Sequence, residues 1–174
     1  MHKETGIYRD WRDGRAYKTI KIGRQLWMAE NLAFRPEFGN YCVYNDHLVN
    51  FRQYGYLYDW ETAREIAPEG WHLPSNQEWE TLHKFLGGSN WQVFNALKEG
   101  GPCGFNLLLG GLCNPFGEFY DMGGSADFWS STLSRDEDGV PDWWSFFSGD
   151  DFREGSSLKS VLPAYKLSVR LIGD

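Results

Sequence analysis

The sequence contains few of the residues that mark several common classes of protein. Cysteine occurs only at Cys42, Cys103 and Cys113, with no C-x-x-C pair, which disfavours a disulfide framework and a zinc site. One bridge is possible, but the spacing does not say which two cysteines would form it. No apolar run approaches the roughly 18–20 residues that span a bilayer, so we expect no membrane insertion. The opening MHKETGIYRDW also lacks the apolar core of a signal peptide.

Basic residues are in the minority as well. The chain has 17 Lys and Arg against 24 Asp and Glu, a formal net charge of −7, so nucleic acid is not an expected partner. Aromatic residues and glycine are abundant instead, with 9 Trp and 20 Gly. Large flat side chains and many turns favour a loop-rich globular protein over a helical bundle. A length of 174 residues fits a single domain, which we assign to residues 1–174.

Two stretches predict β-structure near the ends of the chain. Residues 17–22 and 26–28 are typical of two strands, and Gly23-Arg24 between them fits a two-residue hairpin turn. The closing YKLSVRLIGD alternates apolar and polar residues, which predicts a half-buried strand. The stretch 36–55 is rich in turn-forming residues and carries no clear periodicity.

Helices are indicated in the middle of the chain. DWETAREIA predicts a helix that begins at Asp59 and ends before Pro68. In the next segment, Ser75 and Glu78 form an S-x-x-E capping box, and a shorter helix is expected after Ser89. Helices early and short strands late favour an α+β fold.

Five segments in order resemble one family: DGRAYKTIKIGRQLWMAENL, GYLYDWETA, PEGWHLPSNQEWETL, FWSST and LSVRLI. Together they resemble the Fibrobacter succinogenes major paralogous domain over roughly residues 13–172. The resemblance implies a C-type lectin-like fold of the formylglycine-generating-enzyme branch. In such a fold, two helices pack against a twisted antiparallel sheet, the N- and C-terminal strands pair, and a long irregular segment before the last strand carries the ligand surface.

The resemblance also implies a biological setting. Related folds serve as displayed binding proteins, including variable proteins diversified by retroelements in bacteria, phages and archaeal viruses. This favours a cell-surface, virion or secreted location and a protein or glycan ligand on a cell surface. The family usually has cysteines before GWHLP and after SVR, where this chain has Ala67 and Leu171. The joint loss fits two positions that normally pair, and it weakens the case for an oxidising compartment.

The polar and charged residues suggest no metal site. His72 and His83 lie near Glu78, but no further ligand follows at metal-site spacing, so we expect His72 to form local hydrogen bonds at the turn into the helix. The acidic stretch 136–142 does not follow the ligand order of an EF-hand loop, and the calcium motifs of C-type lectins are absent. A solvated acidic loop is the simpler interpretation, and calcium binding by this loop stays open.

Catalysis is not expected either. A thiol oxidase of the formylglycine-generating type needs a cysteine pair late in the fold. Cys103 and Cys113 come earlier in the chain, without an activating His or Lys nearby. We therefore predict no catalytic residue, no metal and no cofactor.

The stretch PDWWSFFSGDDF, residues 141–152, is the candidate ligand surface. If 142–148 is a strand, Trp143 and Phe147 share one face, which we assign to the core, and Trp144 and Phe146 share the other. A strand buried on both faces is the alternative. The following SGDDFREGSSLKS mixes short polar and charged side chains with turn formers, as adaptable recognition surfaces do. The predicted ligand-binding residues are Trp144, Phe146, Ser148, Asp150, Asp151, Arg153, Ser156 and Ser157.

The sequence thus predicts a non-catalytic domain that binds a protein or glycan ligand through an aromatic and polar C-terminal surface. The alternative is a structural module of a cell-surface or virion assembly, in which the same aromatic residues pack against a neighbouring subunit. Sequences of close relatives would distinguish the two, because changes clustered at 142–157 favour recognition and a fixed surface favours assembly.

Overall fold

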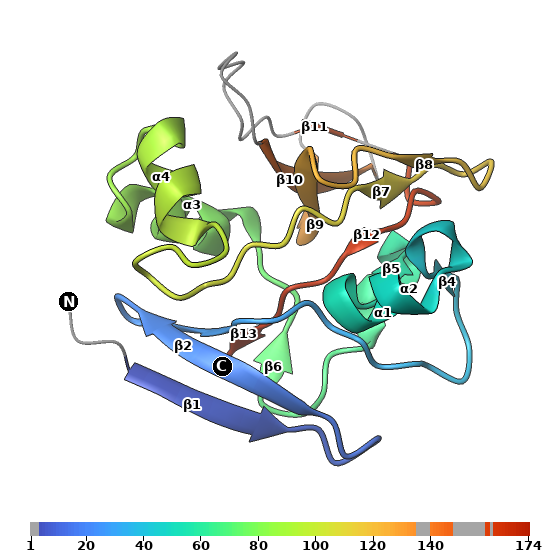
Figure 1. The fold of residues 1–174 in the computed structure, drawn as a ribbon, viewed down its shortest axis with the longest axis horizontal. Coiled ribbons are helices and arrows are strands. Elements are labelled where there is room, and N and C mark those ends of the chain that lie inside the picture. Colours follow the sequence, from blue (N-terminus) through green and yellow to red (C-terminus); the bar gives the residue numbers. More distant parts are fainter. Residues whose placement is uncertain (1–3, 135–139, 148–158, 161) are drawn as a thin grey trace.

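The first sheet brings the two ends of the chain together. The computed structural model describes residues 4–134, 140–147, 159–160 and 162–174 (Figure 1). In this part of the chain, one sheet has the strand order β1-β2-β3-β13-β6. Its strands are β1 (Glu4–Arg9), β2 (Ala16–Ile22), β3 (Gln25–Met28), β6 (Trp71–His72) and β13 (Ile172–Gly173). The predicted hairpin is confirmed as β2 and β3, and β13 pairs with β3 on one side and β6 on the other.

A second sheet has the strand order β11-β10-β9-β12-β5-β4 among the described residues. Its pairs are antiparallel except β9 with β12, which is parallel at Ser168 opposite Phe128. A short hairpin of β7 and β8 forms a third sheet. The bounds are β4 (Tyr41–Cys42), β5 (Leu57–Tyr58), β7 (Leu112–Cys113), β8 (Phe119–Tyr120), β9 (Ser125–Leu133), β10 (Pro141–Phe147), β11 (Lys159–Ser160) and β12 (Leu167–Ser168).

The helices lie beside the sheets in two groups. In Figure 1, α3 and α4 lie together near β9 and β10, whereas α1 and α2 lie near β4 and β5. The bounds are η1 (a 3-10 turn, Tyr44–Asp46), α1 (Leu48–Tyr54), α2 (Trp60–Glu65), α3 (Asn76–Phe85) and α4 (Asn90–Leu97). Few helices and several mainly antiparallel sheets make this a mixed α+β fold. No helix in the described part of the chain is both long and apolar enough to cross a membrane.

The predicted helix starts are confirmed by their caps. The side chain of Asp59 accepts a hydrogen bond from the Thr62 N–H at 2.9 Å. At the start of α3, the Ser75 N–H donates to Glu78 Oε2 at 2.7 Å while Ser75 Oγ accepts from the Glu78 N–H, completing the capping box. Such reciprocal bonds satisfy N–H groups that have no partner within the helix, so the sequence marks these ends clearly.

Helix α1 was not predicted, because the sequence carries no signal for it. None of its residues is buried, and no side chain caps its N-terminus. Its C-terminus is set by Gly55, whose φ is 75°. A Cβ at Gly55 would lie 2.5 Å from the Leu32 carbonyl oxygen, so glycine allows α1 to end directly against the chain that leaves β3.

The predicted C-terminal strand is found as two short strands, β12 and β13, which belong to different sheets, and the segment that contains them is not half-buried. Leu167, Val169 and Leu171 are buried as predicted, but Ser168 and Arg170 are also buried, with Arg170 fully inaccessible. Polar residues are tolerated here because they find hydrogen-bond partners inside the protein. Ala67 and Leu171, which replace the family's usual cysteines, pack in the same apolar cluster, so apolar contact occupies both positions.

Candidate functional site

Strand β10 is covered on both faces, which corrects the predicted exposure of Trp144 and Phe146. Their side chains are only 6% and 4% exposed. Both rings pack against Trp79 of α3, with centroid distances of 6.2 Å for Trp144 and 5.9 Å for Phe146. The two-sided buried strand, the alternative raised from the sequence, is the observed arrangement. Alternation defines two faces but does not reveal that a helix covers the second one.

The polar edge of Trp144 is also occupied. Its indole Nε1 donates to Asn76 Oδ1 at 3.1 Å, and Asn76 Nδ2 donates to Asp142 Oδ2 at 2.7 Å. These bonds tie β10 to the first residue of α3. On the other face Trp143 is buried as predicted, but Phe147, which we had assigned to the core, is 42% exposed.

The other predicted contact residues lie outside the described part of the chain. They are Ser148, Asp150, Asp151, Arg153, Ser156 and Ser157, and the acidic residues 136–138 lie outside it as well. Among the described residues, no group of three or more His, Cys, Asp or Glu side chains is placed to hold a metal ion. The local role predicted for His72 is confirmed, because its ring contacts Glu78 Oε1 at 2.7 Å and Asp174 Oδ1 at 2.6 Å.

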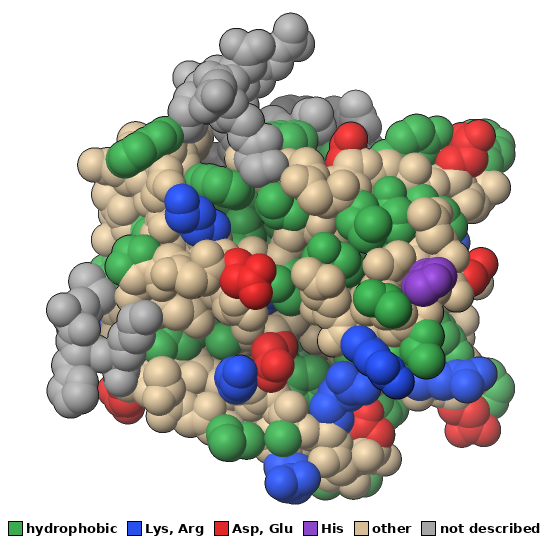
Figure 2. All heavy atoms as spheres, viewed as in Figure 1, with side chains coloured by type: hydrophobic (Ala, Val, Ile, Leu, Met, Phe, Trp, Pro, Cys, Tyr) green, Lys and Arg blue, Asp and Glu red, His purple; other side chains and the backbone are tan. Residues whose placement is uncertain are grey.

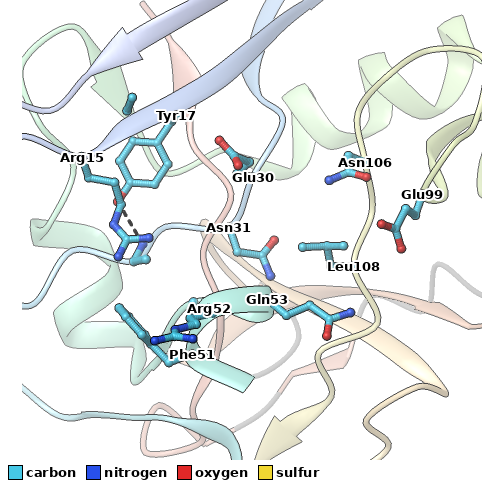
Figure 3. Close-up of a pocket in the computed structure, with 13 residues that line it drawn as sticks. Arg15, Tyr17, Glu30, Asn31, Phe51, Arg52, Gln53, Glu99, Asn106 and Leu108 are labelled. Carbon is cyan, nitrogen blue, oxygen red and sulfur yellow. Dashed lines mark hydrogen bonds between the residues drawn. The ribbon is translucent and has the colours of Figure 1, made fainter. Parts of the chain in front are cut away.

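A polar pocket of about 170 Å³ lies between α1, the start of β2 and the chain that follows α4 (Figure 3). Figure 2 shows acidic and basic side chains close to one another on this face of the molecule. We call this hollow the polar pocket. The polar and aromatic side chains that line it are those of Arg15, Tyr17, Glu30, Asn31, Phe51, Arg52, Gln53, Glu99 and Asn106.

The floor of the polar pocket is formed by Asn31, whose amide is fully engaged. Its Nδ2 donates to the Tyr54 carbonyl at 3.0 Å and to Ser168 Oγ at 3.3 Å. Its Oδ1 accepts from Arg170 Nη2 at 2.7 Å. One amide therefore joins the last carbonyl of α1 to β12 and to the C-terminal segment, which fixes both the floor and the position of α1.

Arg170 supports this floor from inside the core. Its guanidinium donates to the carbonyls of Phe105 at 2.6 Å, Met28 at 3.2 Å and Asn106 at 3.2 Å. Burial lowers the pKa of Arg170 to about 9, which leaves the group charged at neutral pH, while the carboxylate of Glu30 acts in the opposite direction. Asn106 has a φ of 59°, a left-handed backbone conformation that residues other than glycine seldom adopt. The hydrogen bonds from Arg170 to the Phe105 and Asn106 carbonyls help to hold this conformation.

The rim of the polar pocket has a different character from the floor. Figure 3 places Arg15 and Arg52 on one side of Asn31 and Glu99 on the other. Arg15 lies over the Phe51 ring at 5.1 Å. Within the described part of the chain, no hydrogen bond or ion pair engages four of the lining side chains, which are those of Arg52, Gln53, Glu99 and Asn106. The rim therefore offers donors and acceptors that the fold itself does not use.

A second hollow continues from the polar pocket. It has a volume of about 350 Å³, and Gln53, Glu99 and Leu108 line both hollows. Its remaining wall is more apolar and includes Phe94 and Leu107. The two hollows together form a groove that is polar at one end and apolar at the other.

Sequence reasoning missed this site because its residues come from segments far apart in the chain. No spacing rule connects Arg15, Asn31, Gln53 and Asn106. The available signal was indirect, since Asn31 lies in WMAENL and Arg170 in LSVRLI, two of the segments that carried the family resemblance.

The Fibrobacter succinogenes major domain matches residues 20–172, nearly the whole chain. No curated protein and no solved structure matches. The matched range contains most of the residues that line the polar pocket, including Asn31, and it also contains Arg170 beneath the floor. The chain therefore belongs to the Fibrobacter succinogenes major domain family.

Proposed function

We propose that this protein is a non-catalytic ligand-binding domain whose ligand is a hydroxyl-rich group, such as a sugar residue of a glycan, held in the polar pocket. The observation that carries the proposal is the contrast between floor and rim. Asn31 and Arg170 are fixed by internal hydrogen bonds, whereas the side chains of Gln53, Glu99 and Asn106 have no partner among the described residues. A fixed floor under unused polar groups is the arrangement expected of a site that is formed before its ligand binds.

The chemistry of the rim favours hydroxyl groups. Gln53 and Asn106 each present a donor and an acceptor, Glu99 presents acceptors, and Arg52 presents donors. A hydroxyl both donates and accepts, so neighbouring hydroxyls can be matched by such a mixture. The Phe51 ring adds an apolar surface at the edge of the same pocket.

The size of the groove sets a limit on the ligand. At about 170 Å³ the polar pocket is smaller than the roughly 300–1,000 Å³ typical of sites for drug-sized molecules. A single sugar ring suits this volume. The adjoining apolar hollow of about 350 Å³ could then receive the next residue or an acyl or methyl substituent.

The fold assignment that accompanies this proposal is a C-type lectin-like domain of the formylglycine-generating-enzyme branch. Support comes from the family membership and from the sheet that β13 shares with the N-terminal hairpin. A cell-surface, virion or secreted setting and retroelement-driven variation stay part of the proposal. So does a second contact surface for a protein ligand, which rests on composition alone and comprises Ser148, Asp150, Asp151, Arg153, Ser156 and Ser157.

A structural module of a larger assembly is the second candidate. It is favoured by Phe116, Tyr120 and Met122, which are 89%, 45% and 40% exposed on and beside the β7–β8 hairpin. An apolar surface of this kind can pack against a neighbouring subunit. Light scattering after gel filtration tests this function. An oligomer of the native protein that becomes monomeric in Phe116→Ser would favour it, and a native protein that is monomeric at all concentrations would oppose it.

A glycan array tests the binding function. The native protein is compared with Gln53→Ala and with Asn106→Gly, which removes the amide and suits the positive φ of residue 106. Gln77→Ala, an exposed amide on α3, serves as the matched control. We expect at least tenfold weaker binding for the two pocket variants, unchanged binding for Gln77→Ala, and the glycan recovered intact. Equal binding by all variants, or hydrolysed glycan, would contradict the proposal.

A further inference from the structure

Two of the three cysteines meet in the fold although they lie far apart in the sequence. Cys42 is in β4 and Cys113 is in β7. Both belong to one small apolar cluster with Leu57, and Cys113 lies close enough to Cys42 to raise the pKa of its thiol. Both are free thiols in the structure. The sequence left the choice of a cysteine pair open, and in the fold Cys42 and Cys113 are the two that share a cluster.

The third cysteine is excluded by its position. Cys103 packs in a different and larger apolar cluster, which also contains Trp79. Its Sγ donates to the Ala96 carbonyl at 2.8 Å. A bridge from Cys103 to either of the other cysteines would require the two clusters to rearrange.

We propose that Cys42 and Cys113 are a redox pair that forms a reversible disulfide between β4 and β7. The oxidant is a small-molecule disulfide such as oxidised glutathione. The Cys42 thiolate attacks one of its sulfurs, which releases one reduced thiol and leaves a mixed disulfide on Cys42. The Cys113 thiolate then displaces the second reduced thiol. In sum, the two cysteines lose two protons and two electrons, and the external disulfide becomes two thiols.

Cys42 is the residue through which the reaction begins. It is partly exposed, whereas Cys113 is only 2% exposed. Burial raises the pKa of Cys42 to about 12, and the adjacent Cys113 acts in the same direction. Little thiolate is therefore present at neutral pH, so the exchange is slow and proceeds over hours.

The bridge has a consequence for the polar pocket, which rests on the binding function proposed above. From β4 the chain runs through η1 into α1, which supplies Phe51, Arg52 and Gln53 to one wall. The segment that supplies Asn106 and Leu108 to another wall runs directly into β7. A Cys42–Cys113 disulfide thus ties together the two segments that lead into these walls of the pocket.

Peptide mapping of the native protein tests the bridge. The folded protein is incubated with oxidised glutathione, free thiols are alkylated, and the denatured chain is cut with chymotrypsin. Trypsin is unsuitable because no Lys or Arg lies between Cys103 and Cys113. We expect a linked pair of peptides containing Cys42 and Cys113, an alkylated Cys103, and the same link in Cys103→Ser. Three alkylated cysteines, a lasting mixed disulfide on Cys42, or a link to Cys103 would overturn the proposal.

Two further readouts use the same samples. The oxidised protein should melt on the order of 5–10 °C higher than the reduced one, and a thiol reductant should reverse the shift. If the array yields a glycan, its affinity should differ at least threefold between the oxidised and reduced protein. A bridge that forms without any change in affinity would refute the link to the pocket. The binding function itself is tested separately, by the affinity of Gln53→Ala for the glycan.

Discussion

The guanidinium of Arg170 donates a hydrogen bond to the side-chain oxygen of Asn31 over 2.7 Å, in a place where Arg170 has no access to solvent. This contact connects the end of the chain to the floor of the polar pocket. It also joins the pocket to the core, because the same guanidinium holds the carbonyls of Phe105 and Asn106.

Replacement of Arg170 should therefore be costly. Arg170→Met removes the charge and retains much of the volume, but it leaves three carbonyls and the Asn31 oxygen without their donor. We expect a loss of about 3 kcal/mol or more in the free energy of unfolding, measured in urea. Arg64→Ala, which removes an exposed arginine of α2, should cost less than about 1 kcal/mol. Similar losses for both would contradict the role of Arg170.

Trp144 should behave as a core residue. Trp144→Ala empties a site between α3 and β10 and should lower the free energy of unfolding by about 3–5 kcal/mol. Phe147→Ala, on the same strand but 42% exposed, should cost less than about 1 kcal/mol. Denaturant unfolding of the two variants provides the comparison. A stable Trp144→Ala protein would mean that this face of β10 is open.

The capping box at α3 gives a smaller effect. Ser75→Ala removes the acceptor for the Glu78 N–H and should cost about 0.5–2 kcal/mol. Thr81→Ala, within the same helix, serves as the control, because its hydroxyl is exposed and donates to the Gln77 carbonyl within the helix. Equal unfolding midpoints for the native protein and Ser75→Ala would show that the cap does not stabilise α3.

His72 should make stability depend on pH. Burial acts to lower the pKa of His72, but Glu78 and Asp174 outweigh it and raise that pKa above its usual 6.5. The folded protein then holds a proton that the unfolded chain releases, so this stabilisation is complete below about pH 6.5 and is lost as the pH rises through the folded value. Urea midpoints between about pH 5.5 and pH 8.5 should fall in the native protein.

His72→Gln should flatten this pH dependence. His83→Gln, which changes the histidine that hydrogen-bonds Asn90, serves as the matched control. The same slope in His72→Gln would show that another group is responsible.

The sequence predicted those parts of the fold that depend on local contacts. The caps at Asp59 and Ser75 and the β2–β3 hairpin are set by residues a few positions apart, and each is found where expected. Family membership could also be inferred from ordered segments.

The candidate site could not be predicted in the same way. Trp144 was assigned to the surface because alternation along β10 cannot show that α3 covers the second face. Arg170 was expected to face solvent because apolar and polar residues alternate along the last segment, yet four oxygens from distant segments accept hydrogen bonds from it. Helix α1 has neither a side-chain cap nor a buried residue, so the sequence pattern did not predict the helix that carries Gln53.

The central claim is that ligand enters the polar pocket, and titration of isotope-labelled protein tests it most directly. A glycan from the array is added while backbone and side-chain amide signals are recorded by NMR. We predict saturable shifts of the Gln53 and Asn106 side-chain amides and of backbone residues 51–53 and 106–108, with little change for the Trp144 indole. Shifts confined to 147–160, with the polar pocket unaffected, would contradict the account.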